Sequence, residues 1–433
     1  MSVQIQFKIL KKLFLIFILF AILFFNRCKD DPSGPVNYGP NKALYEVEYS
    51  SNTIILPSDA LISIDTVNYS IYTLDKNKVT TKLQPNDILI ISEKAMRKVI
   101  NCKEEDNFII VETTEAKLNE AIKNGKISWD FTPDLSKVTQ VLINKKYAVP
   151  LKNNGDGYEY EFEIGNWTFQ VWMNPKGTAE NGLPELQINF IAVNKACAGG
   201  KITATLGAKG STRLPRQNAE ININNNQTTS FSTKNRGSHS ELTLEYSAVF
   251  SEGGGTAILE LPEIVLRMPL SVLLGIALPI PIYIDYGISL GATVNIPSVT
   301  ATAIGKVKLI LDSDEGLKVE NTAPTFQPSI NDKSLGELWF DIGDMSISPA
   351  PAEVKYNVAC PKVSLNIAGQ EIAWLASVFR TDAVLMVPSL CKAAFCQVRL
   401  DGGYKLGMLG FNFDENETTF FEYGKEVKTP ECP

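Results

Sequence analysis

Hydrophobic and polar residues alternate along much of this chain, most regularly at Tyr158–Ile164, where an aromatic or aliphatic residue stands on either side of every glutamate. An alternation of period two is that of a β-strand, whose successive side chains point to opposite faces. The segment therefore predicts a half-buried strand whose solvated face carries Glu159, Glu161 and Glu163. Because Asn153–Gly157 has the composition of a turn, this strand is expected to pair with one in 141–151.

Similar patterns predict strands along the whole chain. They fall at 43–49, 54–56, 70–74, 88–92, 108–113, 126–131, 167–173, 242–250, 288–296, 299–311, 354–358, 362–367, 383–387, 397–400 and 419–423. Ile264–Ile284 is apolar at almost every position but is interrupted by prolines, which predicts bent strands buried on both faces. Many strands with frequent turns favour a mainly β protein built of antiparallel β-sandwich or barrel domains.

One short helix is expected in the N-terminal domain, at Glu115–Asn124. Leu118, Ala121 and Ile122 have helical spacing there, and Gly125 stands where a helix would end.

With 433 residues the chain is long enough for two or three domains. The expected division is a signal peptide at 1–27, a flexible tether at 28–42, a small β-rich domain with the helix at 43–135, and a larger all-β region at 136–433. The polar residues of 220–240 suggest a solvated loop or edge strand that divides the larger region there.

The first residues have the pattern of a targeting segment. Lys8, Lys11 and Lys12 precede Leu13–Phe25, an uninterrupted apolar run of 13 residues. As a helix this run would be roughly 20 Å long, whereas a bilayer core is roughly 30 Å thick. Export through a signal peptide is therefore favoured over a spanning helix.

Cys28 follows this run and begins the sequence Cys28-Lys29-Asp30-Asp31. This start resembles that of surface-exposed lipoproteins of the Bacteroidetes, in which the cysteine is acylated and a lysine with two acids directs the protein to the outer face of the outer membrane. The resemblance implies a lipid anchor at Cys28 and a place on the cell surface. Arg27 stands where such leaders carry a small residue, so an uncleaved N-terminal anchor stays open as an alternative.

The charge of the chain disfavours nucleic acid as a partner. The formal net charge is −7, and it becomes −11 once a leader with four basic and no acidic residues is removed. Phosphate binding needs a basic surface, and no stretch rich in lysine and arginine supplies one.

Seven cysteines are present, and six remain if Cys28 carries lipid. An even number in an oxidising compartment suggests up to three disulfides among Cys102, Cys197, Cys360, Cys391, Cys396 and Cys432, with the pairing left open. Zinc is the weaker interpretation, because Cys391 and Cys396 are the only close pair and the chain has one histidine.

That histidine, His239, lies in a polar segment and is interpreted as a surface residue. Any multi-histidine metal site is excluded. Asp312 and Asp314 precede Gly316 and are a weak candidate for a calcium loop, whereas a hairpin turn is the favoured interpretation of this segment.

Two further sets of residues are candidate functional sites. Asp285 borders the most apolar segment and could be an acid of raised pKa, with Asp341 or Asp344 as a second carboxylate, but a strand-end acid that reaches solvent is favoured. Trp167 and Trp172 could bind sugar, but their odd spacing places them on opposite faces of one strand.

No pattern indicates a catalytic or cofactor site. The leading hypothesis is a noncatalytic cell-surface lipoprotein with a binding or structural role at the envelope, anchored to the membrane through its lipid. A carbohydrate-active enzyme with paired carboxylates and a carrier of apolar ligands such as lipids are the alternatives. A protein, a glycan or an apolar molecule would accordingly be the partner.

Overall fold

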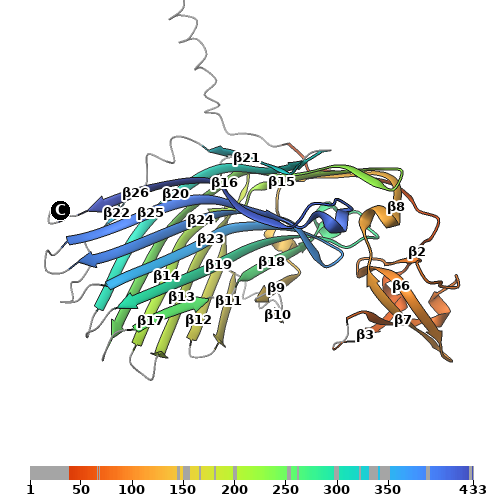
Figure 1. The fold of residues 1–433 in the computed structure, drawn as a ribbon, viewed down its shortest axis with the longest axis horizontal. Coiled ribbons are helices and arrows are strands. Elements are labelled where there is room, and N and C mark those ends of the chain that lie inside the picture. Colours follow the sequence, from red (N-terminus) through yellow and green to blue (C-terminus); the bar gives the residue numbers. More distant parts are fainter. Residues whose placement is uncertain are drawn as a thin grey trace, which may run out of the picture. The chain divides into compact units, whose positions relative to one another are not determined.

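The computed structural model describes residues 39–65, 67, 69–143, 147–149, 157–164, 167–179, 182–197, 202–250, 255–260, 263–296, 302–320, 323–330, 340–341, 352–386, 391–428 and 432. Within them the strands form three sheets, of eleven, nine and six strands (Figure 1). All pairs are antiparallel except β2 with β5. The fold is mainly β, as the alternation predicts.

The eleven-stranded sheet runs in the order β1, β8, β15, β16, β14, β13, β12, β11, with β20 pairing with β16 and with β21 and β22. The strands are β1 (Lys42–Tyr49), β8 (Ile122–Phe131), β11 (Tyr158–Ile164), β12 (Trp167–Thr178), β13 (Pro184–Cys197), β14 (Ile202–Arg213), β15 (Arg216–Asn224), β16 (Gln227–Phe250), β20 (Thr302–Val319), β21 (Thr325–Ile330) and β22 (Phe340–Asp341).

The nine-stranded sheet runs in the order β10, β9, β18, β19, β23, β24, β25, β26, with β17 also on β19. The strands are β9 (Gln140–Ile143), β10 (Tyr147–Val149), β17 (Gly255–Glu260), β18 (Ile264–Pro269), β19 (Ile282–Ile296), β23 (Ala352–Ile367), β24 (Gln370–Met386), β25 (Cys391–Tyr404) and β26 (Asn416–Lys428).

The six-stranded sheet comprises β2 (Thr53–Leu56), β3 (Leu61–Ile64), β4 (Ile71–Asp75), β5 (Ile88–Ile91), β6 (Ala95–Glu104) and β7 (Phe108–Glu115). Two short α-helices are described, α2 (Leu118–Ala121) and α3 (Leu270–Leu274). The 3-10 turns are η1 (Ser58–Ala60), η2 (Lys76–Lys78), η3 (Leu135–Lys137) and η4 (Leu406–Leu409).

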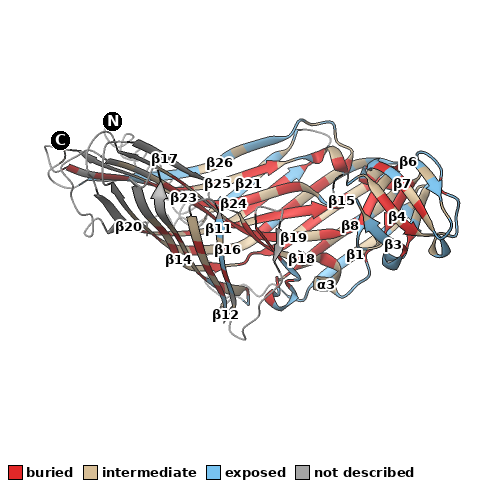
Figure 2. Ribbon diagram, turned by 90° about the horizontal axis from the view of Figure 1, so that it is seen from below, coloured by how far each residue is buried: buried red, intermediate tan, exposed pale blue. Residues whose placement is uncertain are grey.

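The main core lies between the two large sheets. Along many of their strands alternate residues are buried, as in Phe169, Val171 and Met173 of β12, which are at most 1% exposed (Figure 2). Residues of both sheets belong to this one cluster, for example Leu244 of β16 and Phe379 of β24. Fully burying one such side chain contributes about 1.5–3 kcal/mol to folding.

The small sheet has a core of its own, yet one of its strands contributes side chains to both this core and the main core. Leu89 and Ile91 of β5 belong to the small core, whereas Ile88 and Ile90 belong to the main one. Four consecutive apolar residues in β5 therefore reflect a strand that is buried on both faces.

The expected small domain at 43–135 differs from the structure at both ends. Its first and last strands, β1 and β8, pair with each other, and β8 pairs with β15 in the eleven-stranded sheet. Only β2 to β7 form the separate sheet. Strand pairing over long sequence distances, which local patterns do not record, decides this division.

The predicted helix is shorter than expected. Leu118–Ala121 is helical, but Ile122 already begins β8. Gly125 ends no helix: it lies in β8, where a Cβ would meet Val47 of β1 at 2.9 Å. In Ile264–Ile284 two strands form as expected, but α3 and a turn join them.

The expectation of a solvated boundary at 220–240 is wrong. This segment is the hairpin of β15 and β16 in the middle of the large sheet, and Thr233, Asn235 and Ser238 are buried. A buried polar side chain is stable where it has a hydrogen-bond partner, as Thr233 has when it accepts a hydrogen bond from Gln217 at 2.8 Å.

Cys391 forms a disulfide with Cys432, which links the start of β25 to the chain beyond β26. Cys102, Cys360 and Cys396 are free thiols. Of the three bridges envisaged, one is therefore present among the described cysteines. The side chain of Cys197 lies outside the described residues. Burial raises the pKa of the Cys360 and Cys396 thiols to about 12, so both stay protonated at neutral pH.

Glycines let aromatic rings lie directly against strands of the nine-stranded sheet. The indole of Trp374 in β24 covers Gly403 in β25, so that a Cβ at position 403 would overlap its Nε1, Cε2 and Cζ2 atoms. On the other face, Gly402 lies under Phe326 and Phe420, whose rings stack at 4.9 Å. The Gly402-Gly403 pair thus lets both faces of β25 carry aromatic rings.

This packing predicts the effect of a single added methyl group. We expect Gly403→Ala to lower the free energy of unfolding by about 1–3 kcal/mol, because the Trp374 ring must move. Chemical denaturation would measure the change. Gly407→Ala is the control, since a Cβ there meets nothing within 4 Å; equal losses in the two variants would contradict the assignment.

Candidate functional site

A cleft of about 340 Å³ opens on the nine-stranded sheet, where β24 begins, β25 ends and β26 begins. Its lining is mixed: an indole ring, two lysines, three glutamates, an asparagine and a tyrosine surround two apolar residues. The residues are Lys362, Glu371, Ile372, Ala373, Trp374, Tyr404, Lys405, Glu415, Asn416 and Glu417. A concave surface with an aromatic wall and several hydrogen-bonding groups is the usual form of a ligand site.

The cleft lies on the outer face of the sheet. Ser377 and Phe379 of β24 are buried in the interior, so Trp374, Ala376 and Val378 stand on the opposite face, where they form a small cluster with Ala359. Trp374 itself is half-buried.

Lys362 is the central charge of the cleft. A register shift in β23 between Ala359 and Lys362 turns this lysine outward after the inward-facing, fully buried Cys360. Its Nζ lies 3.0 Å from Glu263 Oε1, 3.9 Å from Glu371 Oε1 and 4.8 Å from the centroid of the Trp374 ring. These contacts hold the ammonium in one place, as a cation over an indole face.

A second lysine at the rim is compensated as well. Lys405 Nζ lies 3.4 Å from Glu415 Oε2, and both side chains are largely exposed. Such an exposed pair contributes little to stability. Since each lysine of the cleft has an acidic neighbour, the cleft has no surplus of positive charge for an anion.

A buried carboxyl group lies in the interior between the two large sheets. Glu315 of β20 is 2% exposed and accepts hydrogen bonds from Ser313 and from Ser377 of β24, both at 3.0 Å. Burial raises the pKa of this carboxyl group, although the two hydroxyl groups oppose the shift. It joins the two sheets by a polar contact.

Sequence reasoning missed Glu315 because it regarded 312–316 as a turn. The segment lies inside β20, opposite a bulge of β16 between Asn235 and Ser238. Asp312 and Asp314 each have a partner: Asp312 pairs with His239, Nδ1 to Oδ1 2.7 Å, and Asp314 accepts the Gly237 amide at 2.7 Å. Within the described part of the chain, no three His, Cys, Asp or Glu side chains gather as a metal site requires.

Asp285 does not reach solvent as expected. It is 3% exposed, lies within β19 rather than at its end, and forms two bonds with Arg267, at 2.9 Å to Nε and 2.7 Å to Nη2. Asn366 donates a further bond at 2.8 Å. Asp285 thus has a structural role beside β18 and β23. Asp344 and Cys28 lie outside the described residues, and so does the side chain of Asp341.

The remaining candidates lie as predicted. Trp167 packs against the main core, 6.4 Å from the ring centroid of Phe169, and Trp172 stands on the opposite face of β12. Glu159, Glu161 and Glu163 are exposed along β11. His239 lies half-buried on the outer face of β16, beside Asp312.

No family model, no curated protein and no solved structure matches this chain. Among the residues that the structure describes, no helix is long and apolar enough to cross a membrane.

The raised pKa of Glu315 predicts how stability depends on pH. The folded state favours the protonated carboxyl, so this group stabilises the fold fully below its ordinary pKa of 4.5, and the contribution is lost as pH rises through the raised value. Glu315→Gln cannot ionise. We therefore expect its unfolding free energy to fall less than that of the wild type between pH 4.5 and 8, as measured by denaturation at several pH values.

The exposed Glu161→Gln is the matched control, because its side chain is in solvent. Parallel pH profiles for Glu315→Gln and the wild type would contradict the assignment of Glu315 as the titrating group.

Proposed function

We propose that this chain is a noncatalytic lipoprotein of the outer bacterial surface, held by a lipid on Cys28, and that its folded body binds a partner through the outer face of the nine-stranded sheet. The observation that carries the binding role is the cleft at Trp374. It is concave and polar, has an aromatic wall, and lies apart from the apolar interior.

The arrangement of charge supports binding rather than chemistry. Lys362 and Lys405 are engaged by Glu371 and Glu415 across or beside the cleft. Paired charges present a fixed pattern of hydrogen-bonding groups to a ligand. The interior carboxyl, Glu315, is enclosed by Ser313 and Ser377 between the sheets.

The proposed location on the cell surface rests on the sequence. Lys8, Lys11 and Lys12 followed by the apolar run, and then Cys28-Lys29-Asp30-Asp31, support export and acylation. Because Pro40, Asn41 and β1 from Lys42 belong to the folded body, residues 28–39 would form the tether, which reaches at most about 40 Å when fully extended. Such a tether would let the body meet partners away from the membrane surface.

Acylation is tested by changing Cys28 in the full chain. We expect the wild type to incorporate a labelled fatty acid and to partition into detergent, and Cys28→Ser to lose both properties, because the thioether linkage requires the sulfur. Cys102→Ser is the control and should keep the label. Intact-mass analysis that finds residues 1–27 still attached and no acyl chain would refute the lipoprotein assignment in favour of an uncleaved anchor.

A second variant tests display on the surface. Replacing Lys29, Asp30 and Asp31 by alanine should leave the fatty-acid label in place but remove the body from the reach of protease added to intact cells. Equal protease sensitivity of this variant and the wild type would contradict the role given to these three residues.

A further inference from the structure

The aromatic side chains on the outer face of the nine-stranded sheet are arranged in a way that points to a class of ligand. We propose that this face binds a neutral polysaccharide, which enters the cleft at Trp374 and follows β25 toward Phe395. The inference names the ligand of the binding role proposed above and rests on that role.

Two rings on this face each lie against a glycine of the next strand. Trp374 of β24 covers Gly403 of β25, and Phe395 of β25 covers Gly424 of β26. Without a Cβ beneath them, the rings can lie close to the backbone. Phe395 is 38% exposed although it is large and apolar, and Trp374 borders the cleft. Sugars present C–H groups that pack on such rings, and the exposed part of Phe395 offers that contact, whereas Lys362 lies over the Trp374 ring at the entrance to the cleft.

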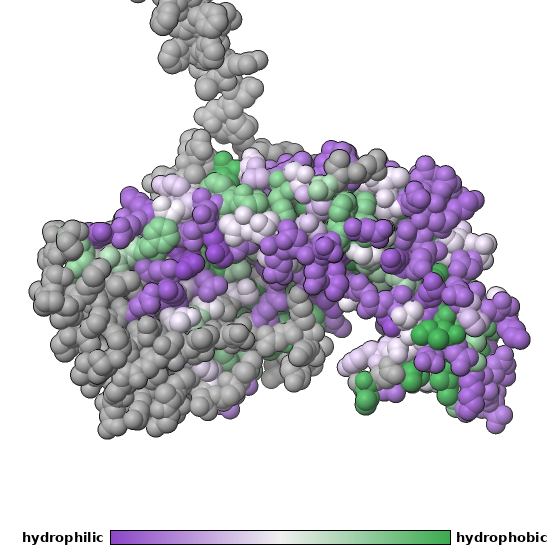
Figure 3. Space-filling model, viewed as in Figure 1, coloured by the Kyte–Doolittle hydropathy of each residue, from purple (hydrophilic) through white to green (hydrophobic). Residues whose placement is uncertain are grey.

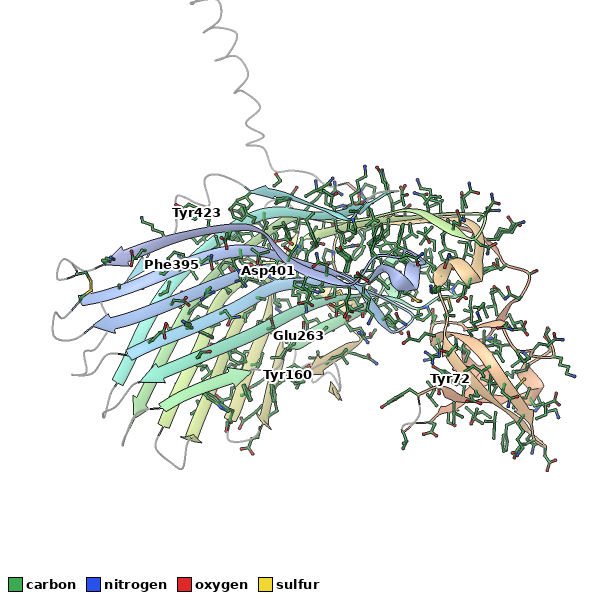
Figure 4. All side chains as sticks on the ribbon, viewed as in Figure 1. Tyr72, Tyr160, Glu263, Phe395, Asp401 and Tyr423 are labelled. Atoms are coloured by element: carbon green, nitrogen blue, oxygen red, sulfur yellow. A yellow bond between two sulfur atoms is a disulfide. The ribbon has the colours of Figure 1, made fainter. Side chains whose placement is uncertain are left out.

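The spacing of the two rings fits an extended chain. The Phe395 ring lies over Gly424, which pairs with Gln397, and Gln397 is six residues from Gly403 beneath Trp374. At about 3.3 Å per residue the two rings are roughly 20 Å apart, the length of an oligosaccharide of several units. Figure 4 shows Phe395 and Asp401 following one another along β25.

Planar polar groups occupy the outer positions of β25 between the rings. Gln397 donates to Glu422 at 3.1 Å, and Arg399 donates to Asp401 at 2.8 Å. Asp401 also accepts a bond from Thr419 at 2.7 Å. Amide, guanidinium and carboxylate groups held in this way suit the paired hydroxyl groups of a sugar. Figure 3 shows hydrophilic residues over much of the described part of this face, with hydrophobic ones among them.

The balance of charge favours a neutral polymer. Arg399 and Arg380 are paired with Asp401 and Asp382, at 2.8 and 2.6 Å, and the lysines of the cleft with glutamates. The chain as a whole carries a net charge of −7. A sulfated or phosphorylated polymer needs excess positive charge, which these pairs do not offer.

The test is calorimetric titration of the full chain in detergent with disaccharides and hexasaccharides of the cello, malto, manno, xylo and chito series, and with heparin as an anionic probe. We expect at least one neutral hexasaccharide to bind, and heparin not to bind. Trp374→Ala should weaken the binding of both the hexasaccharide and its disaccharide about tenfold, because the cleft is the entry site.

Phe395→Ala should weaken only the hexasaccharide, since a disaccharide cannot span from the cleft to Phe395. Trp172→Ala, on the outer face of the other large sheet, is the matched control and should bind as the wild type does. If Trp374→Ala fails to fold, Asn416→Ala and Glu417→Ala at the exposed rim replace it and should weaken binding as well.

The inference is overturned if no neutral hexasaccharide binds at millimolar concentration, if heparin binds more tightly, or if Trp172→Ala loses as much affinity as Trp374→Ala. The broader proposal, that this face binds a partner, is tested separately. A protein partner captured by the wild type but not by Trp374→Ala, without any saccharide binding, would leave the surface-binding role standing and remove the polysaccharide.

Discussion

The structure depends on burying one face of each long strand between two large sheets. A single strand or hairpin is marginal in water, because its ordering costs about 1–2 kcal/mol per residue in backbone entropy. In this protein the offset comes from the main core, where side chains of both sheets, such as Phe190 of β13 and Leu365 of β23, belong to one buried cluster. The large sheets are therefore stable only together, and positions far apart in the chain must find one another during folding.

The same burial constrains the polar residues that the sheets enclose. Trp129 donates to Gln217, which donates to Thr233, and Glu315 accepts from Ser377 on the facing sheet. Each of these bonds joins different strands, so they fix register where apolar contacts alone would permit slippage. A bulge in β16 between Asn235 and Ser238 reverses the faces of the strand and leaves His239 outside with Asp312.

The outer face of the nine-stranded sheet is less constrained by packing than the interior, and its composition differs from that of the core. Ion pairs such as Arg380 with Asp382 lie there, and aromatic rings rest on Gly403 and Gly424 rather than on core side chains. The cleft exists because β23, β24 and β25 bring Lys362, Trp374 and Tyr404 to one end of the sheet. The residues of such a cleft can vary without disturbing the interior.

The sequence alone determined the β character of the chain and many, but not all, of its strands. Period-two alternation identified β11, placed Trp167 and Trp172 on opposite faces and put the three glutamates of β11 in solvent, because the pleat of a strand is a local property. It also showed that the segment after Ile264 could not be one helix.

Only the tertiary structure decided which strands are neighbours. The burial of Asn235 and Glu315, the pairing of β1 and β8 within the large sheet, and the meeting of Lys362 with Trp374 all depend on registers between distant segments. The polar pattern of 220–240 and the acids of 312–316 resemble loops, because polar side chains favour solvent unless hydrogen-bond partners are present in the interior. Those partners are on other strands, and a single sequence does not show where they lie.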